Sequence, residues 1–257
     1  TFLDELEDIE KNFFVKTASS KTENFFYTGT HIANISTLDR TKGKVLYDYA
    51  FKSWGYNHIG HDRGMVKIKN ILEITYREKK QTDSQIFFTP DAASGPKNNN
   101  RFYLFHGSPL INWKSIILNG LCLPSHGGMF GKGIYFASSI GKSFGYVYDR
   151  GGGNNSDIPV KAKKNYAIGI FEVNLGNMKQ LTQSCSNIDR KSLERQYDSV
   201  WGVGSNSILQ TIDYEGVKVP IVETQNRKLN TSLIHDEYII YEQQFAVLKY
   251  VVFLEDR

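Results

Sequence analysis

Short runs of β-branched, aromatic and aliphatic residues follow one another through most of the chain from residue 66 onward, a pattern typical of strands. The runs that predict strands cover residues 66–68, 71–76, 102–105, 166–175, 217–222, 237–241 and 245–254. The longest helix predicted among them covers residues 113–118. Because helices do not regularly alternate with these strands, the sequence favours an α+β fold over a doubly wound α/β fold.

The first part of the chain has a helical pattern instead. Apolar side chains recur at helical spacing from Phe2 to Phe14, and acidic residues fill much of the other face, which predicts an amphipathic helix over residues 2–16. A second helix, packed on a sheet, is predicted from the same spacing of Tyr47, Ala50, Phe51 and Trp54. The segments whose composition predicts loops are residues 57–64, 89–100 and 151–157.

The composition is that of a soluble globular protein. A chain of 257 residues suffices for one large domain, or for one domain with an appendage. No apolar run approaches the roughly 20 residues that a membrane-spanning helix needs, so we do not expect a membrane protein. The net charge of +4 is mild and the basic residues are scattered, so we do not expect this segment to bind DNA or other nucleic acid.

The cysteines and the start of the chain bear on its setting. Cys122 and Cys185 are too few for a disulfide framework and lack the paired spacing of a zinc site, which favours a reducing, intracellular compartment; a bridge between them is the less favoured alternative. The chain begins at Thr1 without Met or a leader, so we expect it to be a fragment of a longer protein.

Two glycine-rich segments invite a phosphate-binding interpretation that their spacing does not support. Residues 127–133 contain a Gly-Lys pair, but the glycine spacing is short for a P-loop and a glycine follows the lysine. Residues 201–204 lack the third glycine of a dinucleotide fingerprint, and we interpret both segments as turns. His58, His61 and Asp62 have no further ligand nearby, so a plain loop role is favoured over a metal site.

Three motifs acquire a chemical meaning when they are taken together: residues 104–108, 129–137 and 235–241. The histidine at the end of the first motif, taken alone, is more often a structural residue than a catalyst. Together, however, the motifs present a His, a Tyr and a Glu from strand-like runs. Such a set can surround a sugar that must become a cation.

These motifs resemble those of the catalytic domain of the poly(ADP-ribose) polymerases, a family of diphtheria-toxin-like ADP-ribosyltransferases, and specifically its DNA-damage-responsive branch. Residues 199–204 are similar to that branch's Ser-Val-x-Gly-x-Gly turn, and residues 230–238 to the segment with its catalytic Glu. Residues 3–10 resemble the last helix of its regulatory helical subdomain. The resemblance implies a residual helix over residues 1–18 and a transferase domain over residues 19–257, with two packed, mostly antiparallel sheets and an NAD+ groove between them.

The chemistry implied by the resemblance suits these residue types. NAD+ must lose nicotinamide through an oxocarbenium-like transition state, so its site needs flat apolar walls and an anion near the sugar. By the resemblance, Tyr135 and Tyr146 sandwich the nicotinamide ring. The backbone of Gly107 holds the carboxamide at the close approach that glycine permits, and the Ser143 hydroxyl completes its hydrogen bonding. Glu237 then hydrogen-bonds the nicotinamide ribose, stabilises positive charge and polarises the acceptor hydroxyl.

The resemblance implies the remaining site residues as well. His106, which contacts the adenosine ribose, completes the catalytic set with Tyr135 and Glu237. Further adenosine contacts are expected from Ser108, Asn112 and Asp8. The residues implied on the acceptor side are Met129, Lys142 and His235, and His235 stands where relatives have Tyr. Residues 122–128 make a short loop over the donor site without the Cys and His cluster that holds zinc in the tankyrase branch, so we expect no metal.

The function implied is transfer of ADP-ribose from NAD+ to protein side chains, including the protein's own, and to existing ADP-ribose chains, with release of nicotinamide. A mono-ADP-ribosyltransferase and a non-catalytic NAD+- or ADP-ribose-binding module of the same fold are the alternatives. Benzamide-type inhibitors should bind, and a nuclear location is expected. Only the final helix of the helical subdomain is present, so we expect activity without DNA, with any DNA-sensing domains elsewhere in the parent protein.

Overall fold

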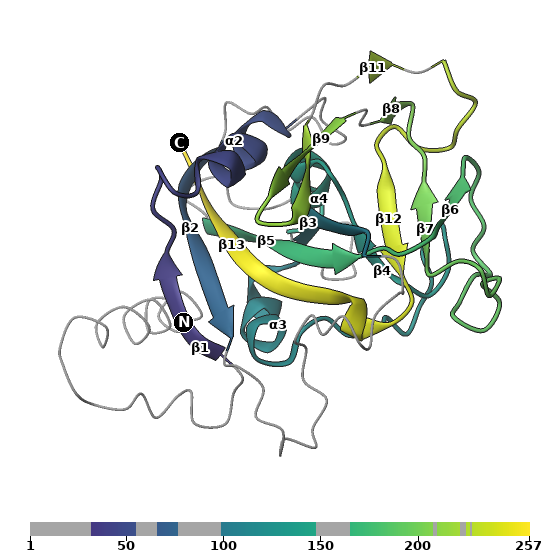
Figure 1. The fold of residues 1–257 in the computed structure, drawn as a ribbon, viewed down its shortest axis with the longest axis horizontal. Helices are drawn as coiled ribbons and strands as arrows, with labels where there is room; N and C mark the ends of the chain where they lie inside the picture. The colour runs from purple at the N-terminus through teal and green to yellow at the C-terminus, as the bar shows by residue number, and fades with distance from the viewer. Residues whose placement is uncertain are drawn as a thin grey trace, which may run out of the picture.

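The computed structural model describes residues 32–54, 66–76, 99–147, 165–207, 210–221, 225–226 and 228–257 of the chain. Within these residues the fold consists of two sheets of mostly antiparallel strands, a two-stranded ribbon and short helices (Figure 1). The predicted α+β class is therefore confirmed.

The larger sheet has the strand order β1-β2-β13-β5-β3-β10-β9. Its strands are β1 (Ile32–Thr37), β2 (Val66–Tyr76), β3 (Arg101–Gly107), β5 (Asn165–Asn174), β9 (Gln210–Tyr214), β10 (Val217–Ile221) and β13 (Ala246–Asp256). All neighbours pair antiparallel except β3 and β10, which run parallel. Strands β5 and β13 are buried along most of their length, because both faces of the sheet are covered.

The smaller sheet lies beside one end of the larger one (Figure 1). It has the order β4-β12-β7-β6, with β4 at Ile134–Phe136, β6 at Met178–Leu181, β7 at Ser199–Gly202 and β12 at Glu237–Ile240. β12 pairs antiparallel with both neighbours, and β6 runs parallel to β7. The ribbon joins β8 (Asn206–Ser207) to β11 (Gln225–Asn226).

Side chains alternate between two hydrophobic clusters along β3. Phe102 and Leu104 belong to the cluster that includes residues of the smaller sheet and of helix α3 (Trp113–Asn119). Tyr103 and Phe105 belong to the cluster that includes residues of helices α2 (Lys44–Lys52) and α4 (Ile140–Phe144). This period of two is that of an extended strand, and here it makes the larger sheet the middle layer of the fold.

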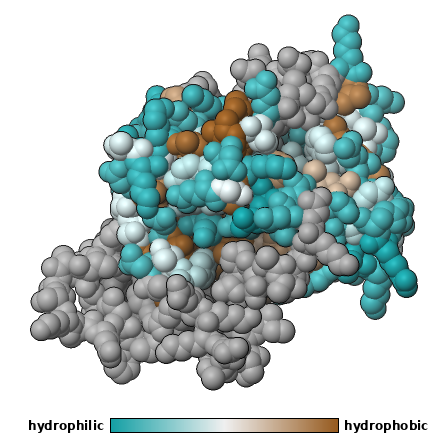
Figure 2. All heavy atoms as spheres, in the orientation of Figure 1, coloured by the Kyte–Doolittle hydropathy of each residue, from teal (hydrophilic) through white to brown (hydrophobic). Residues whose placement is uncertain are grey.

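The smaller sheet is also buried on both faces. Tyr238 and Ile240 of β12 point into the cluster shared with the larger sheet, whereas Ile239 packs in a third cluster that includes Phe130 and Leu233. With the apolar faces of both sheets covered, the described surface in Figure 2 is mainly hydrophilic, with separated apolar spots.

The two helices predicted inside the described residues are confirmed. The helix predicted over residues 113–118 is α3, and the second predicted helix is α2, whose Tyr49 hydroxyl donates to the Tyr103 carbonyl over 3.0 Å. Phe51, which was predicted to lie on the buried face of this helix, does not. It is 50% exposed, because the turn of α2 directs Leu46, Tyr49 and Ala50 toward the sheet instead. Two 3-10 turns, η3 (Leu110–Asn112) and η4 (Gln243–Phe245), were not predicted.

The strand predictions needed three corrections. Residues 66–68 and 71–76 form the single strand β2, and the short strands β1, β6, β7, β8, β9 and β11 were not predicted as such, whereas β4 is the strand-like run that presents Tyr135. The interpretation of residues 201–204 as a turn is wrong for Trp201 and Gly202, which belong to β7. A Cβ at Gly202 would lie 2.6 Å from the Phe130 ring, so packing, and not a turn, requires that glycine. Residues 127–133 do turn, with backbone hydrogen bonds in both directions between Gly128 and Gly131.

Several predictions lie outside the described residues. They are the helix over residues 2–16 with Asp8, the loops at 57–64 and 151–157, residues 89–98 of the third loop, and the histidines His58 and His61. Of the helices that are described, none combines the length and the apolar character needed to cross a bilayer.

Candidate active site

Glu237 is the first residue of β12, the strand that pairs with neighbours on both sides in the smaller sheet. Its backbone pairs with Gly202 of β7, and the next residue, Tyr238, pairs with Phe136 of β4. The residue is only 7% exposed. A carboxylate is costly to bury without partners, so its contacts indicate its role.

Lys142 is the partner of one oxygen of Glu237. It lies in α4, whose N-cap Ser139 accepts a hydrogen bond from the Lys142 amide. The Lys142 Nζ is 2.7 Å from Glu237 Oε1 and donates to the His235 carbonyl over 3.1 Å. Burial lowers the pKa of Lys142, and attraction to Glu237 acts in the opposite direction. Glu237 Oε2 is buried and has no hydrogen-bond partner among the described residues, so it remains available to a ligand.

His106 lies near the end of β3, and its ring packs beside Phe136 and Phe171. Its Nδ1 is 2.9 Å from the carbonyl oxygen of Tyr135. A carbonyl only accepts, so Nδ1 carries the hydrogen. Burial lowers the pKa of His106, against the opposing effect of that hydrogen bond, so the ring is neutral and its Nε2 is a hydrogen-bond acceptor.

Tyr135 of β4 lines the site and also holds the loop before it. Its hydroxyl accepts from the Phe130 amide and donates to the Gly131 carbonyl, each over 2.9 Å. Burial raises the pKa of Tyr135 to about 12, so the phenol stays protonated at neutral pH. A Cβ at Gly128 would lie 2.8 Å from the Tyr135 ring, so that glycine leaves room for the phenol.

The backbone of Gly107 faces the site because of the hydrogen-bond alternation of β3. Phe105 exchanges both backbone hydrogen bonds with Ala137, on the side of β3 away from β5. Every second residue of an antiparallel strand directs its N–H and C=O to the same side, so those of Gly107 point the same way. A Cβ at Gly107 would lie 1.9 Å from the Ser143 carbonyl oxygen, which excludes any side chain there.

One pocket unites most of the residues that the motifs single out. It has about 380 Å³ of empty volume. Its lining residues are His106, Gly107, Tyr135, Phe136, Ala137, Lys142, Ser143, Tyr146 and Glu237. The larger sheet contributes through β3 and the smaller sheet through β4 and β12, so the pocket lies between the two sheets. Phe136 and Ala137 were not predicted to belong to the site, although both lie in the second motif.

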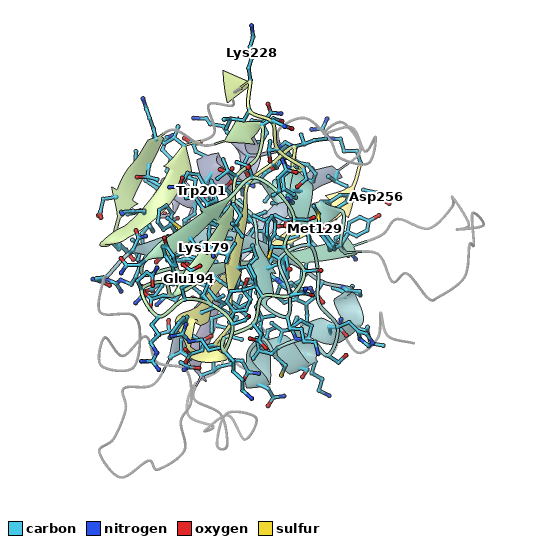
Figure 3. All side chains as sticks on the ribbon, turned by 90° about the vertical axis from the view of Figure 1, so that its right-hand side faces the viewer. Met129, Lys179, Glu194, Trp201, Lys228 and Asp256 are labelled. Carbon is cyan, nitrogen blue, oxygen red and sulfur yellow. The ribbon has the colours of Figure 1, made fainter. Side chains whose placement is uncertain are left out.

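The other predicted site residues lie outside the lining of this pocket. Ser108 is buried, and its hydroxyl accepts from the Asn112 side chain over 2.9 Å. Met129 is 39% exposed on the face seen in Figure 3. His235 is buried and reaches Lys142 through its carbonyl group. Asp8 is outside the described residues.

Metal-binding side chains do not gather in the described part of the chain, where no group of three or more His, Cys, Asp or Glu residues is placed to hold an ion. Cys122 and Cys185 are both exposed, free thiols.

Comparison with known proteins decides the family. The family model described as the poly(ADP-ribose) polymerase catalytic domain matches residues 56–256, which is most of the chain. The chain belongs to the poly(ADP-ribose) polymerase family. This confirms the resemblance drawn from the motifs, and every residue that lines the pocket lies within the matched range.

Individual poly(ADP-ribose) polymerases agree with the chain over most of its length. Poly(ADP-ribose) polymerase 2 of Arabidopsis thaliana is 30% identical over 81% of the chain and 34% of the relative. Poly(ADP-ribose) polymerase 1 of Xenopus laevis is 29% identical over 84% of the chain and 20% of the relative. The poly(ADP-ribose) polymerase of Drosophila melanogaster is 28% identical over 98% of the chain and 24% of the relative. The chain thus spans about a third or less of the length of these relatives.

Proposed function

We propose that the chain transfers ADP-ribose from NAD+ to protein side chains, including its own, and to ADP-ribose already attached, with release of nicotinamide and without a metal. The observation that carries the proposal is the free oxygen of Glu237. A buried carboxylate oxygen that has no hydrogen-bond partner among the described residues, in a pocket beside His106 and Tyr135, fits a site for a ligand that becomes cationic.

The nicotinamide end of NAD+ suits one side of the pocket. The N–H and C=O of Gly107 offer one donor and one acceptor, as a primary carboxamide requires, and Ser143 lines the pocket beside them. The rings of Tyr135 and Tyr146 supply aromatic faces, which attract a pyridinium cation. We assign the ring of the donor to this part of the site.

The bond that breaks joins ribose C1 to the pyridinium nitrogen. Its electron pair stays on nitrogen, so nicotinamide leaves neutral and the positive charge passes to the ribose. Glu237 stabilises that charge through its free oxygen, while Lys142 holds the other oxygen in place over 2.7 Å. The neutral His106 offers Nε2 as an acceptor to a ribose hydroxyl of the bound donor.

The second half of the reaction forms a bond between ribose C1 and an acceptor oxygen. Glu237 accepts the hydrogen bond of the incoming hydroxyl and so raises its nucleophilicity, and the proton is then released to solvent. The exposed Met129 and the buried His235 border this side in our assignment, and Ser108 and Asn112 the adenosine side. A nuclear location and activity without DNA remain predictions.

A single labelling experiment tests the proposal. Incubation with NAD+ labelled in its adenine should give a ladder of modified products. One sharp modified band would instead indicate mono-ADP-ribosyl transfer, the alternative that stays open because chain growth depends on the acceptor pocket as well as on Glu237. Absence of label with intact NAD+ binding would indicate a binding module and refute the proposal.

A further inference from the structure

Asp236 is a buried carboxylate beside the site that the proposed reaction does not use. It is 1% exposed and immediately precedes Glu237. Its Oδ1 accepts a hydrogen bond from the Gly204 amide over 2.8 Å, and its Oδ2 lies 3.4 Å from the Tyr238 hydroxyl. A carboxylate at this depth needs a compensating charge as well as hydrogen bonds.

The contact with Gly204 ties the end of β7 to the start of β12. A Cβ at Gly204 would lie 2.5 Å from the His235 carbonyl carbon, so the two backbones are in direct contact there. The next pair along, Gly202 and Glu237, are partners in the sheet (Figure 1). Asp236 therefore fixes the position from which the Glu237 side chain enters the pocket.

The second effect of Asp236 is electrostatic and acts on Lys142. The charges that favour the ammonium form of Lys142 are those of Glu237 first and Asp236 next, and both raise its pKa against the effect of burial. The other titratable side chains that line the pocket with Lys142 are His106 of β3, Tyr135 of β4 and Tyr146. Two carboxylates and one ammonium leave an excess of one negative charge beside the neutral His106.

That excess matters for a cation in the pocket. If Lys142 faced Glu237 alone, the pair would be neutral and would attract a ribosyl cation weakly. With Asp236 as a second counter-charge, the cluster stays anionic as a whole. On the basis of the proposed function, we propose that Asp236 is a positioning residue for the Lys142–Glu237 pair: it anchors Glu237 through Gly204 and balances the Lys142 charge, so that Glu237 acts as an anion.

Asp236→Asn tests the electrostatic part, because it keeps an oxygen to accept from Gly204 and removes the charge, with an NH2 group in place of the Oδ2 that accepts from the Tyr238 hydroxyl over 3.4 Å. The kcat of nicotinamide release should fall by roughly tenfold, the order expected for the loss of one buried charge near the site, with little change in the KM for NAD+. Losing a negative neighbour lowers the pKa of Lys142, so the ion pair that holds Glu237 Oε1 in place, and the activity that depends on that ion pair, should be lost at a lower alkaline pH than in the unaltered chain. A purely structural role of Asp236 would leave the alkaline limb of the pH–rate profile unchanged.

Asp198→Asn is the matched control, because Asp198 also accepts a backbone N–H, that of Asn177 over 2.8 Å, but does not line the pocket. It should leave kcat and the pH profile unchanged. Asp236→Glu keeps the charge and should return the alkaline limb toward that of the unaltered chain. Equal kcat and equal alkaline limbs for Asp236→Asn and Asp198→Asn would overturn the inference, as would an Asp236→Glu limb that stays shifted.

A readout without turnover separates this inference from the proposed function. NMR of labelled lysine can follow the titration of Lys142 in the unaltered chain and in Asp236→Asn. A lower Lys142 pKa in the variant supports the inference, and an unchanged one overturns it. If the unaltered chain released no nicotinamide, the proposed function would fail, while this titration would still decide whether Asp236 acts on Lys142.

Discussion

The hydroxyl of Tyr135 donates to the carbonyl oxygen of Gly131 over 2.9 Å, so the ring that lines the pocket also anchors the loop that carries Met129. The same hydroxyl accepts from the Phe130 amide. The Tyr241 hydroxyl fixes the loop from the other side, through the Phe130 carbonyl over 2.7 Å. The donor and acceptor sides that we propose for the site are thus joined by one phenol.

Tyr135→Phe should therefore affect the stability of the fold and the use of acceptors more than the binding of the donor NAD+. The change removes two hydrogen bonds of a half-buried group, which should destabilise the fold by about 1–3 kcal/mol. Modification of a protein acceptor should fall more than hydrolysis of NAD+, because the ring remains while the Met129 loop loosens. Thermal unfolding and the two rates measure this. Tyr214→Phe removes an exposed hydroxyl on β9 and is the control; equal effects of both variants would contradict the anchoring role.

Glu237→Gln should abolish most of the transfer without abolishing binding. It keeps the shape of the side chain but removes the charge that stabilises the ribosyl cation, so the rate should fall by roughly 100-fold to 1,000-fold while NAD+ affinity changes little. Nicotinamide release and NAD+ binding by calorimetry measure the two quantities. Glu194→Gln, which removes a surface carboxylate beside Lys179, is the control (Figure 3). Undiminished transfer by Glu237→Gln would refute the mechanism.

Benzamide should bind in the pocket, because it presents the nicotinamide carboxamide on an aromatic ring. Binding to the folded chain alone raises its melting temperature by mass action. Ser143→Ala should weaken binding by about 1–2 kcal/mol, the range for one lost partner of a buried hydrogen bond. Titration calorimetry gives this difference, with the exposed Ser125→Ala as control. If the Tyr135→Ala/Tyr146→Ala double variant bound benzamide as tightly as the unaltered chain, the pocket would be wrongly assigned.

Mild acid should destabilise the domain through His106. Burial holds the pKa of His106 below its ordinary value of 6.5, so the unfolded chain takes up the proton first as the pH falls. The contribution of the neutral ring to stability is complete above pH 6.5 and is lost as the pH falls through the lowered pKa. Denaturant unfolding at a series of pH values should therefore show a stability loss that His106→Asn lacks. A similar loss of stability in His106→Asn would show that groups other than His106 cause it.

The fold class, α3, the buried strands and most of the pocket residues, though not Phe136 and Ala137, could be predicted from the amino-acid sequence. The period of two along β3, with Phe102 and Leu104 alternating with Tyr103 and Phe105, is local and can be recognised without neighbours. The motif around Glu237 was equally local. Trp201 and Gly202 were misinterpreted because glycine marks a turn in isolation, whereas here it makes room for Phe130.

The ion pairs and hydrogen bonds between those residues depend on the tertiary structure and could not be predicted from the sequence. Lys142 and Glu237 lie far apart in sequence and pair at 2.7 Å only because α4 and β12 meet at the same end of the two sheets. The hydrogen of His106 is placed on Nδ1 by a carbonyl of another strand, and the charge of Asp236 has meaning only beside Gly204 and Lys142. Residue spacing encodes local periods, but charge and hydrogen bonding depend on distances across strands, which register and packing set.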